Sequence, residues 1–212
     1  MRRYFITGTD TGVGKTWVTC SLARLAVSRG QRVFAFKPIE TGCSERDGRL
    51  VGEDQELLCD AAGGWQEGEL RGVYRFRLPA APHVAAAAEG SRVEDAPLAA
   101  AVSRGTKGAD LVLIEGAGGW RVPIREDLDM GGYAKQLGAP VILVGRAGLG
   151  TINHCLLTAE AILRDGLELA AVVLSVRPDD DRAFAGSNAS EISRCLGRSV
   201  LLSSDPGALT LL

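Results

Sequence analysis

Short runs of apolar residues that favour β-strands recur at intervals along the chain. They are continuously apolar rather than alternating with polar positions, which is typical of strands buried on both faces of a parallel sheet between two layers of helices. The predicted strands span residues 4–7, 32–36, 111–114, 141–144, 171–174 and 199–202.

Stretches of helical character separate these runs, and most of them stop at a glycine, where helices commonly end. The predicted helices span residues 15–28, 55–62, 96–104, 129–137, 152–164 and 181–196. Because the two kinds of element alternate, we predict one α/β domain over residues 1–212, a doubly wound, mostly parallel sheet with helices on both faces. Residues 42–90 are long and irregular, and we expect a lid or substrate region there, at the carboxyl ends of the strands.

A glycine-rich segment follows the first predicted strand and leads directly into the first predicted helix. It reads Gly8-Thr9-Asp10-Thr11-Gly12-Val13-Gly14-Lys15-Thr16. Glycines let backbone amides curl around a phosphate, and the new helix N-terminus adds positive potential. In such a loop the lysine reaches the β and γ phosphates and the next hydroxyl ligates Mg²⁺. The loop is a variant, because Gly8 stands one residue early, and it predicts a P-loop NTPase fold that binds ATP or another nucleoside triphosphate.

Charged residues end two other predicted strands. Lys37 ends the second, and Glu115 ends the third, just before Gly116-Ala117-Gly118-Gly119. Because the carboxyl ends of parallel strands meet at one edge of a sheet, we expect Lys37 near the phosphates and Glu115 at Mg²⁺. Asp54 has two interpretations, a second carboxylate for the metal or the N-cap of helix 55–62. A lysine at a strand end contributes little to stability, so Lys37→Ala is expected to abolish turnover far more than it weakens folding.

Composition narrows the class of protein. The 212 residues are 46% hydrophobic and 24% charged with a net charge of −2, which excludes disorder for most of the chain and argues against a general nucleic-acid or anionic-membrane binder. Five scattered cysteines and two distant histidines give no disulfide framework and no His/Cys metal site. Without an apolar run near the ~20 residues of a membrane span or a signal-peptide core, we expect a cytoplasmic protein.

Lysine is rare beside arginine in this chain. The lysines are Lys15, Lys37, Lys107 and Lys135 among 24 basic residues. We expect the first two to be kept for their compact ammonium groups, which suit a moving phosphate, and the last two to lie on the surface.

Taken together, these segments resemble the dethiobiotin synthetase family. The resemblance is close over residues 4 to about 160 and thin from about Ser175 onward. EGAGG followed by VP, the loop GTDT-x-VGKT and TINH in this order are jointly specific. The matching segments are GTDTGVGKT (8–16), KPIETG (37–42), GEDQELL (52–58), PAAPHVAA (79–86), EGAGGWRVPI (115–124), DMGGYAKQLGAPVILV (129–144) and GLGTINHCLLT (148–158).

The resemblance implies an ATP- and Mg²⁺-dependent ligase of biotin biosynthesis. Such an enzyme closes the ureido ring of dethiobiotin from 7,8-diaminononanoate (diaminopelargonate) and CO₂ or bicarbonate. A carbamate and then a carbamic-phosphoric anhydride form, and ADP and phosphate are released. Carried over to this sequence, the catalytic residues are Lys37, Lys15 and Thr11, with Lys37 bridging the carbamate and the γ phosphate. The implied Mg²⁺ ligands are Thr16, Asp54 and Glu115.

The same resemblance implies a set of binding residues and a partner. The implied nucleotide contacts are Gly12, Val13, Gly14, Lys15, Thr16, Trp17, Glu115, Gly116, Ala117, Gly118 and Ser175. The implied substrate contacts are Thr41, Gly118, Gly119, Val122, Pro123, Leu149, Gly150, Thr151 and Asn153. The family works as a homodimer with the active site at the interface, so the loop before helix 152–164 would come from the partner and offer a helix N-terminus to the substrate carboxylate. For Asn153, capping of that helix is the alternative.

One position departs from the family pattern. Many members have Asn near residue 175, where an amide can make paired hydrogen bonds to adenine, but a serine cannot make that contact. With Ser175 here, we expect relaxed selectivity for the nucleotide base, with affinity concentrated on the triphosphate.

Two other functions are alternatives to this one. A synthetase domain of the cobyrinate amidase or CTP synthetase type also activates a substrate oxygen with ATP, but it is normally fused to a glutaminase for which 212 residues leave no room. A non-enzymatic ATP switch of the partitioning type carries a signature lysine where this chain has Asp10.

Overall fold

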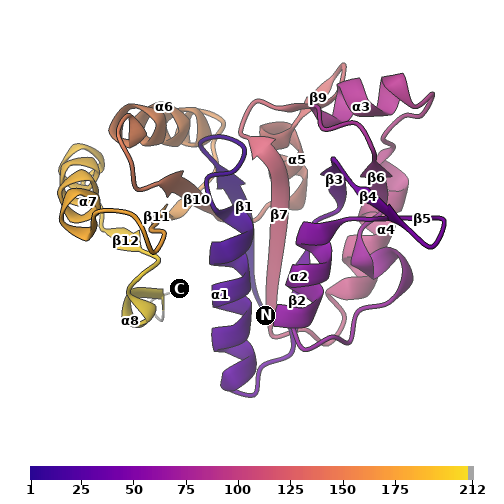
Figure 1. Ribbon diagram of the computed structural model, residues 1–212, viewed down its shortest axis with the longest axis horizontal. Helices are drawn as coiled ribbons and strands as arrows, with labels where there is room; N and C mark the ends of the chain where they lie inside the picture. The colour runs from indigo at the N-terminus through magenta and orange to yellow at the C-terminus, as the bar shows by residue number, and fades with distance from the viewer. Residues whose placement is uncertain (210–212) are drawn as a thin grey trace.

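The computed structural model describes residues 1–209 and is built around a parallel sheet of six strands (Figure 1). The strands lie in the order β12-β11-β10-β1-β7-β2, and every pairing between them is parallel. This confirms the predicted fold class. The strands are β1 (Arg2–Gly8), β2 (Val33–Phe36), β7 (Leu111–Gly119), β10 (Val141–Arg146), β11 (Leu169–Ser175) and β12 (Val200–Leu202).

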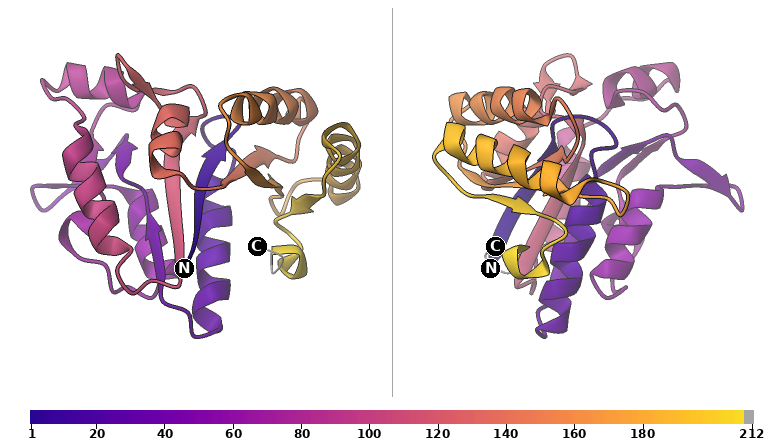
Figure 2. Two further views of the ribbon diagram at one scale, coloured as in Figure 1. Left: turned by 180° about the vertical axis from the view of Figure 1, so that it is seen from behind. Right: turned by 60° about the vertical axis from the view of Figure 1, so that its left-hand side comes forward.

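Helices cover both faces of this sheet. One face carries α1 (Lys15–Ser28), α2 (Glu53–Ala61) and the short α8 (Pro206–Leu209). The other carries α4 (Asp95–Gly105), α5 (Met130–Leu137), α6 (Thr151–Arg164) and α7 (Arg182–Leu196). Seen from behind, α4 and α5 stand in front of the strands, as the left view of Figure 2 shows.

The strands are continuously apolar because each face of the sheet has its own core. Along β7, Leu111 and Leu113 belong to the core beneath α1 and α2, while Val112 and Ile114 belong to the core on the opposite face. Successive side chains of a strand point to opposite faces, so a strand covered on both sides needs apolar residues at every position.

The region 42–90 is more regular than the sequence predicts. β3 (Ile39–Thr41) pairs in parallel with β6 (Tyr74–Phe76), and β4 (Ser44–Arg46) forms a hairpin with β5 (Arg49–Val51). The remaining short elements are η1 (Gly68–Arg71), α3 (Pro82–Ala88) and the hairpin of β8 (Pro123–Arg125) with β9 (Leu128–Asp129). In Figure 1, α3 and β9 lie at the same end of the sheet as the loop between β1 and α1.

Two helix boundaries bear on the site. α1 begins at Lys15, as predicted, but α2 begins at Glu53 with Gly52 as its N-cap. The interpretation of Asp54 as an N-cap is therefore wrong, because this residue already lies within the first turn of the helix. Among the described residues, no helix is both long enough and apolar enough to cross a membrane.

Candidate active site

The loop between β1 and α1 has the backbone geometry that a phosphate cradle needs. Gly12 and Gly14 adopt φ values of 71° and 97°, a region that residues with a Cβ rarely adopt. Gly14 also packs directly against Ser175, because a Cβ at position 14 would lie 2.1 Å from the Ser175 Oγ. The loop therefore depends on glycine for its conformation and for its contact with β11.

Lys15 curls back over this loop. Its Nζ donates to the backbone carbonyl of Asp10 at 3.0 Å, and only 6% of the residue is exposed. Burial lowers the pKa of Lys15 to about 8, and the nearby charge of Glu115 offsets only part of that effect. An incoming phosphate group would supply the negative charge that the buried ammonium needs.

Glu115 sits at the centre of the site and is fully buried. Both of its carboxylate oxygens accept hydrogen bonds from α1, one from the Thr16 Oγ1 at 2.8 Å and the other from the Thr19 Oγ1 at 2.7 Å. Thr16 and Thr19 are three residues apart and so lie on the same side of the helix. This arrangement fixes the carboxylate beside the phosphate loop.

Lys37 lies between two carboxylates. Its Nζ contacts the Asp54 Oδ2 in a short ion pair and lies 3.3 Å from the Glu115 Oε1. Burial lowers the pKa of Lys37, but the charges of Glu115 and Asp54 outweigh it and hold the pKa above its ordinary value. With 7% of the residue exposed, Lys37 is not the solvated strand-end lysine assumed in the stability argument. The premise that this lysine contributes little to stability is therefore wrong, whereas the larger loss of turnover expected for Lys37→Ala stays a prediction.

The oxygen ligands at this point fit a magnesium ion. Mg²⁺ is commonly bound in proteins through one or two carboxylates together with substrate phosphates and water. Thr16, Asp54 and Glu115 offer one hydroxyl and two carboxylates around the ammonium of Lys37, beside the phosphate loop. Within residues 1–209 no group of three or more His, Cys, Asp or Glu side chains forms a denser metal site.

Thr16, Lys37 and Asp54 open onto a cavity of about 620 Å³. Its walls combine the phosphate loop with the ends of β3 and β7 and with the segment before α3. The cavity brings together many of the predicted site residues, and its lining is Thr11, Gly12, Gly14, Lys15, Thr16, Lys37, Thr41, Asp54, Pro79, Ala80, Ala81, Pro82, Ala117, Gly118 and Val122.

Comparison with known proteins places this site in a family. A family model described as an AAA domain matches residues 2–204. The chain is 41% identical over 203 residues to the ATP-dependent dethiobiotin synthetase BioD of Anaeromyxobacter dehalogenans (strain 2CP-C), covering 95% of this chain and 88% of that protein. The chain belongs to the dethiobiotin synthetase family. It is thus an ATP-dependent ligase of biotin biosynthesis, as the resemblance predicted.

Solved structures of more distant proteins share the fold. Chloroplast FtsY from Physcomitrella patens superposes with a TM-score of 0.54 at 19% identity, covering 94% of this chain and 56% of that one. The signal recognition particle receptor FtsY from Elizabethkingia anophelis superposes with a TM-score of 0.50 at 18% identity, covering 94% and 57%. The chain spans little more than half the length of these two proteins, and at this identity the likeness concerns the fold alone.

A second cavity, about 400 Å³, lies on the other side of the phosphate loop. Ser175 and Leu149 line it, together with the guanidinium-bearing Arg146 and Arg177. Arg177 donates to the Gly12 carbonyl at 2.9 Å and so ties the segment after β11 to the loop. Ser175 is therefore placed beside the loop and largely buried, with its hydroxyl facing Gly14.

Several predicted residues lie outside the first cavity. Trp17 follows Thr16 on α1 and is 59% exposed, while Thr151 is buried with its hydroxyl 3.5 Å from the Cys155 Sγ. The N-cap of α6 is Gly150, so Asn153 is an exposed residue of the first turn and not the cap. The residues that do not line the first cavity are Val13, Trp17, Glu115, Gly116, Gly119, Pro123, Leu149, Gly150, Thr151, Asn153 and Ser175.

Three buried residues of the site are absent from the set predicted from the sequence, namely Thr19, Glu40 and Gln55. Thr19 lies one turn after Lys15 in a helix whose start was known, so its helical spacing could have revealed it. Nothing in the pattern marks the other two. Glu40 accepts hydrogen bonds from two backbone amides of α2, and burial raises its pKa even though the Lys37 charge opposes the shift.

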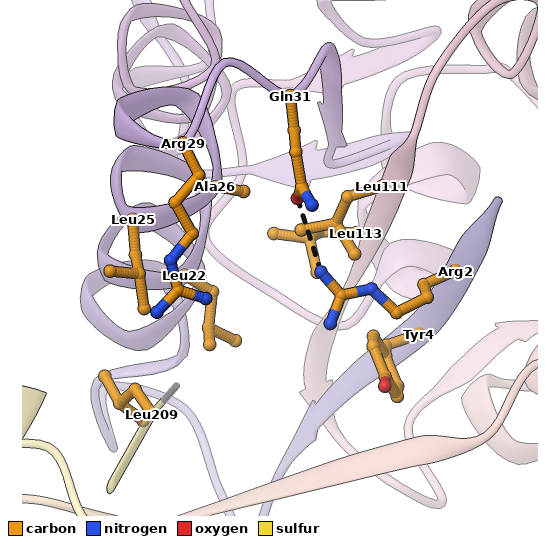
Figure 3. A pocket seen from close by; sticks show the side chains of 10 residues that line it. All are labelled: Arg2, Tyr4, Leu22, Leu25, Ala26, Arg29, Gln31, Leu111, Leu113 and Leu209. Carbon is orange, nitrogen blue, oxygen red and sulfur yellow. Dashed lines mark hydrogen bonds between the residues drawn. The ribbon is translucent and has the colours of Figure 1, made fainter. Parts of the chain in front are cut away.

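A further groove lies at the opposite end of the sheet from the phosphate loop (Figure 3). Side chains of α1 and β7, such as Leu25 and Leu111, form its apolar walls, and Arg2 at the start of β1 borders it and donates to the Gln31 side chain at 3.3 Å. The seven residues of β1 separate this groove from the loop, so it contributes no residue to the candidate active site.

Proposed function

We propose that one domain spanning residues 1–212 closes the ureido ring of dethiobiotin. Its substrates are ATP, CO₂ or bicarbonate, and 7,8-diaminononanoate, and its products are dethiobiotin, ADP and phosphate. The arrangement that carries the proposal is the buried Lys37 ammonium, held between Asp54 and Glu115 at the wall of the cavity that also contains the phosphate loop.

The first part of the reaction joins CO₂ to one amine of the substrate. The amine nitrogen forms a bond to the carbon of CO₂ and loses a proton, which leaves a carbamate anion. Thr41, which lines the cavity at the end of β3, would hydrogen-bond the diamine or the carbamate. Lys37 would lie between the carbamate and the γ phosphate, where its charge reduces the repulsion between the two anions.

The second part is a phosphoryl transfer to the carbamate. A carbamate oxygen forms a bond to the γ phosphorus while the bond to the bridging oxygen of ADP breaks, which gives a carbamic-phosphoric anhydride. Lys15 and Thr11 would hold the phosphates, with the loop amides of Gly12, Val13 and Gly14 beside them. Thr16, Asp54 and Glu115 would hold Mg²⁺, which when bound supplies positive charge to the phosphate oxygens.

Ring closure completes the reaction. The second amine attacks the carbonyl carbon of the anhydride, the bond from that carbon to the phosphate oxygen breaks, and the nitrogen loses a proton. Proximity is the main contribution of the protein at this stage, because the two amines already belong to one bound molecule. Gly118 and Val122 line the cavity, and together with Gly119 and Pro123 nearby they would hold the substrate.

A mass-based assay tests the proposal directly. Incubation with ATP, Mg²⁺, bicarbonate and diaminononanoate is expected to give dethiobiotin, together with ADP in equal amount. Omission of the diamine or of bicarbonate should suppress both products. ADP release that needs neither of them would overturn the proposal.

We also propose a homodimer in which each site receives a loop from the partner. Support comes from exposed apolar side chains on and near α6, with Leu149 at 82% and Leu157 at 58% exposure. The exposed Leu149, Gly150 and Asn153 of one protomer would face the substrate tail bound by the other. The N-terminus of α6, which begins at the buried Thr151, would attract the carboxylate of that tail. We also propose that the enzyme acts in the cytoplasm, where its five unpaired cysteines stay reduced.

Mixing two inactive variants tests the shared site. Lys37→Met removes a residue of the cavity, and Leu149→Asp places a charge on the loop offered to the partner. In random mixed dimers about half of the molecules hold one intact site, so about a quarter of the wild-type activity should return. A mixture that stays inactive, or a wild-type protein that is monomeric by light scattering, would exclude the shared site.

The nucleotide base is proposed to matter little for affinity. Ser175 is placed against Gly14 and offers one hydroxyl rather than a bidentate amide. GTP and CTP should therefore compete with ATP at similar concentrations in a binding assay. A strong preference for ATP would contradict this part of the proposal.

A further inference from the structure

Glu40 is a buried acid that lines neither cavity but contacts the start of α2, the helix that carries Asp54. It lies in β3, and only 7% of the residue is exposed. Its two carboxylate oxygens accept hydrogen bonds from the backbone N–H groups of Asp54, at 2.9 Å, and Gln55, at 3.0 Å. Both amides belong to the first turn of α2, where backbone donors lack partners within the helix.

Gln55 extends this contact to Lys37. Only 1% of the residue is exposed, and its Oε1 accepts a hydrogen bond from the backbone N–H of Lys37 at 2.6 Å. The Asp54 side chain, one residue earlier, contacts the Nζ of the same lysine. The first turn of α2 is therefore joined to Lys37 at both its backbone and its ammonium, and Glu40 fixes that turn from the other side.

The fit around Glu40 is tight. A Cβ at Gly52, the N-cap of α2, would lie 2.4 Å from the Glu40 Oε2 and 2.8 Å from its carboxyl carbon. Only glycine at position 52 lets the buried carboxylate reach both amides. The N-cap of α2 therefore packs directly against this side chain.

We infer that Glu40 is a positioning residue, which sets Asp54 and Lys37 at the distance that phosphoryl transfer needs. The inference rests on the proposed function for the roles of these two residues. Glu40 itself lines neither of the two cavities. Outer-shell partners of this kind typically change metal affinity or activity by 10–100-fold when they are replaced.

A purely structural role would have a different signature. If Glu40 only capped α2, its replacement would lower the unfolding temperature and leave metal binding to the folded protein unchanged. If it positions Asp54, the metal affinity must fall even where the protein is fully folded. The two roles are separated by measuring binding well below the unfolding temperature.

The experiment uses Mn²⁺ as a probe, because this ion takes the same oxygen ligands as Mg²⁺ and is visible by electron paramagnetic resonance. Mn²⁺ is titrated into the protein with ADP present, for wild type, Glu40→Gln, Glu40→Met and Glu53→Gln. Glu53 is the matched control, since it lies in the same helical turn with a side chain 64% exposed. Gln keeps one acceptor, whereas Met keeps none.

We expect Glu40→Gln to raise the Kd for Mn²⁺ about tenfold and Glu40→Met to raise it further. Glu53→Gln should match wild type. In the Asp54→Asn background, Glu40→Gln should have no additional effect, because the residue through which it acts is already changed. In turnover, kcat should fall while the KM for the diamine stays constant.

Two results would overturn the inference. One is a Glu40→Gln protein with a lower unfolding temperature but an unchanged Kd for Mn²⁺ and an unchanged kcat. The other is a full additional loss of Mn²⁺ affinity in the Asp54→Asn background. Since Mn²⁺ binding with ADP needs neither diamine nor bicarbonate, a failure to make dethiobiotin would count against the proposed function and leave this test standing.

Discussion

Replacing Lys37 with methionine is the sharpest test of how the site is held together. The substitution keeps a flexible apolar stem and removes the ammonium between Asp54 and Glu115. Glu115 is fully buried, and its Oε1 lies 3.3 Å from the ammonium that the substitution removes. We expect the substitution to change both the free energy of unfolding and the stabilisation of the protein by divalent cations.

The size of the effect follows from the burial of each partner. Removing one member of a buried ion pair costs about 3–5 kcal/mol, because the other charge is left uncompensated. The Asp54 side chain is 39% exposed and can be solvated in part, so we place the loss near the lower limit, about 3 kcal/mol. For a chain of this length that lowers Tm by about 6–12 °C.

The assay is thermal and chemical denaturation of Lys37→Met beside Lys135→Met, an exposed lysine with the same change of side chain. Lys135→Met should stay within about 0.5 kcal/mol of wild type. Mg²⁺ should raise the Tm of Lys37→Met more than that of wild type, because the two carboxylates would then lack their resident cation. Adding Glu115→Gln to Lys37→Met should recover part of the stability and none of the turnover. An unfolding free energy equal to that of Lys135→Met would refute the reasoning.

Further predictions concern the phosphate loop and its support. The folded pKa of Lys15 lies near 8, and bound phosphate favours its charged form, so the complex holds more protons than the free protein. Calorimetry in buffers of different ionisation enthalpy should show uptake of about half a proton per ATP bound at pH 8. The affinity for ATP should fall at higher pH. The absence of proton uptake would show that Lys15 is already charged in the free protein. Gly14→Ala should abolish ATP binding and lower Tm. Adding Ser175→Gly to this variant should restore only part of the stability, since it relieves the contact with residue 175 but not the φ of 97°. Full recovery would show that backbone strain is unimportant. Thr19→Val should lower the free energy of unfolding in urea by about 1–3 kcal/mol, because a Glu115 oxygen loses its donor. Ser21→Ala, which removes an exposed hydrogen bond of the same helix, should lower it far less. Equal losses would contradict the role of Thr19.

Local parts of the site follow from the sequence because their residues are neighbours in the chain. The phosphate loop and the start of α1 at Lys15 need only the glycines and the helix that follows them. Parallel strands buried on both faces also follow from continuous apolar runs. This is why Lys37, directly after β2, and Glu115, in β7 directly after its last pair with β2, could be placed at one edge, although β7 continues to Gly119.

The tertiary structure decided what distant residues do to one another. Ile39 pairs with Tyr74 across 35 residues, so β3 and β6 are stabilised by each other rather than by their own sequence. At the start of α2, two backbone amides donate to the carboxylate of Glu40, which lies in β3. Burial of Lys37 likewise comes from elements that meet only in the fold. Sequence patterns report local propensity and burial, whereas the distance between two charges and the water around them are properties of the packed molecule.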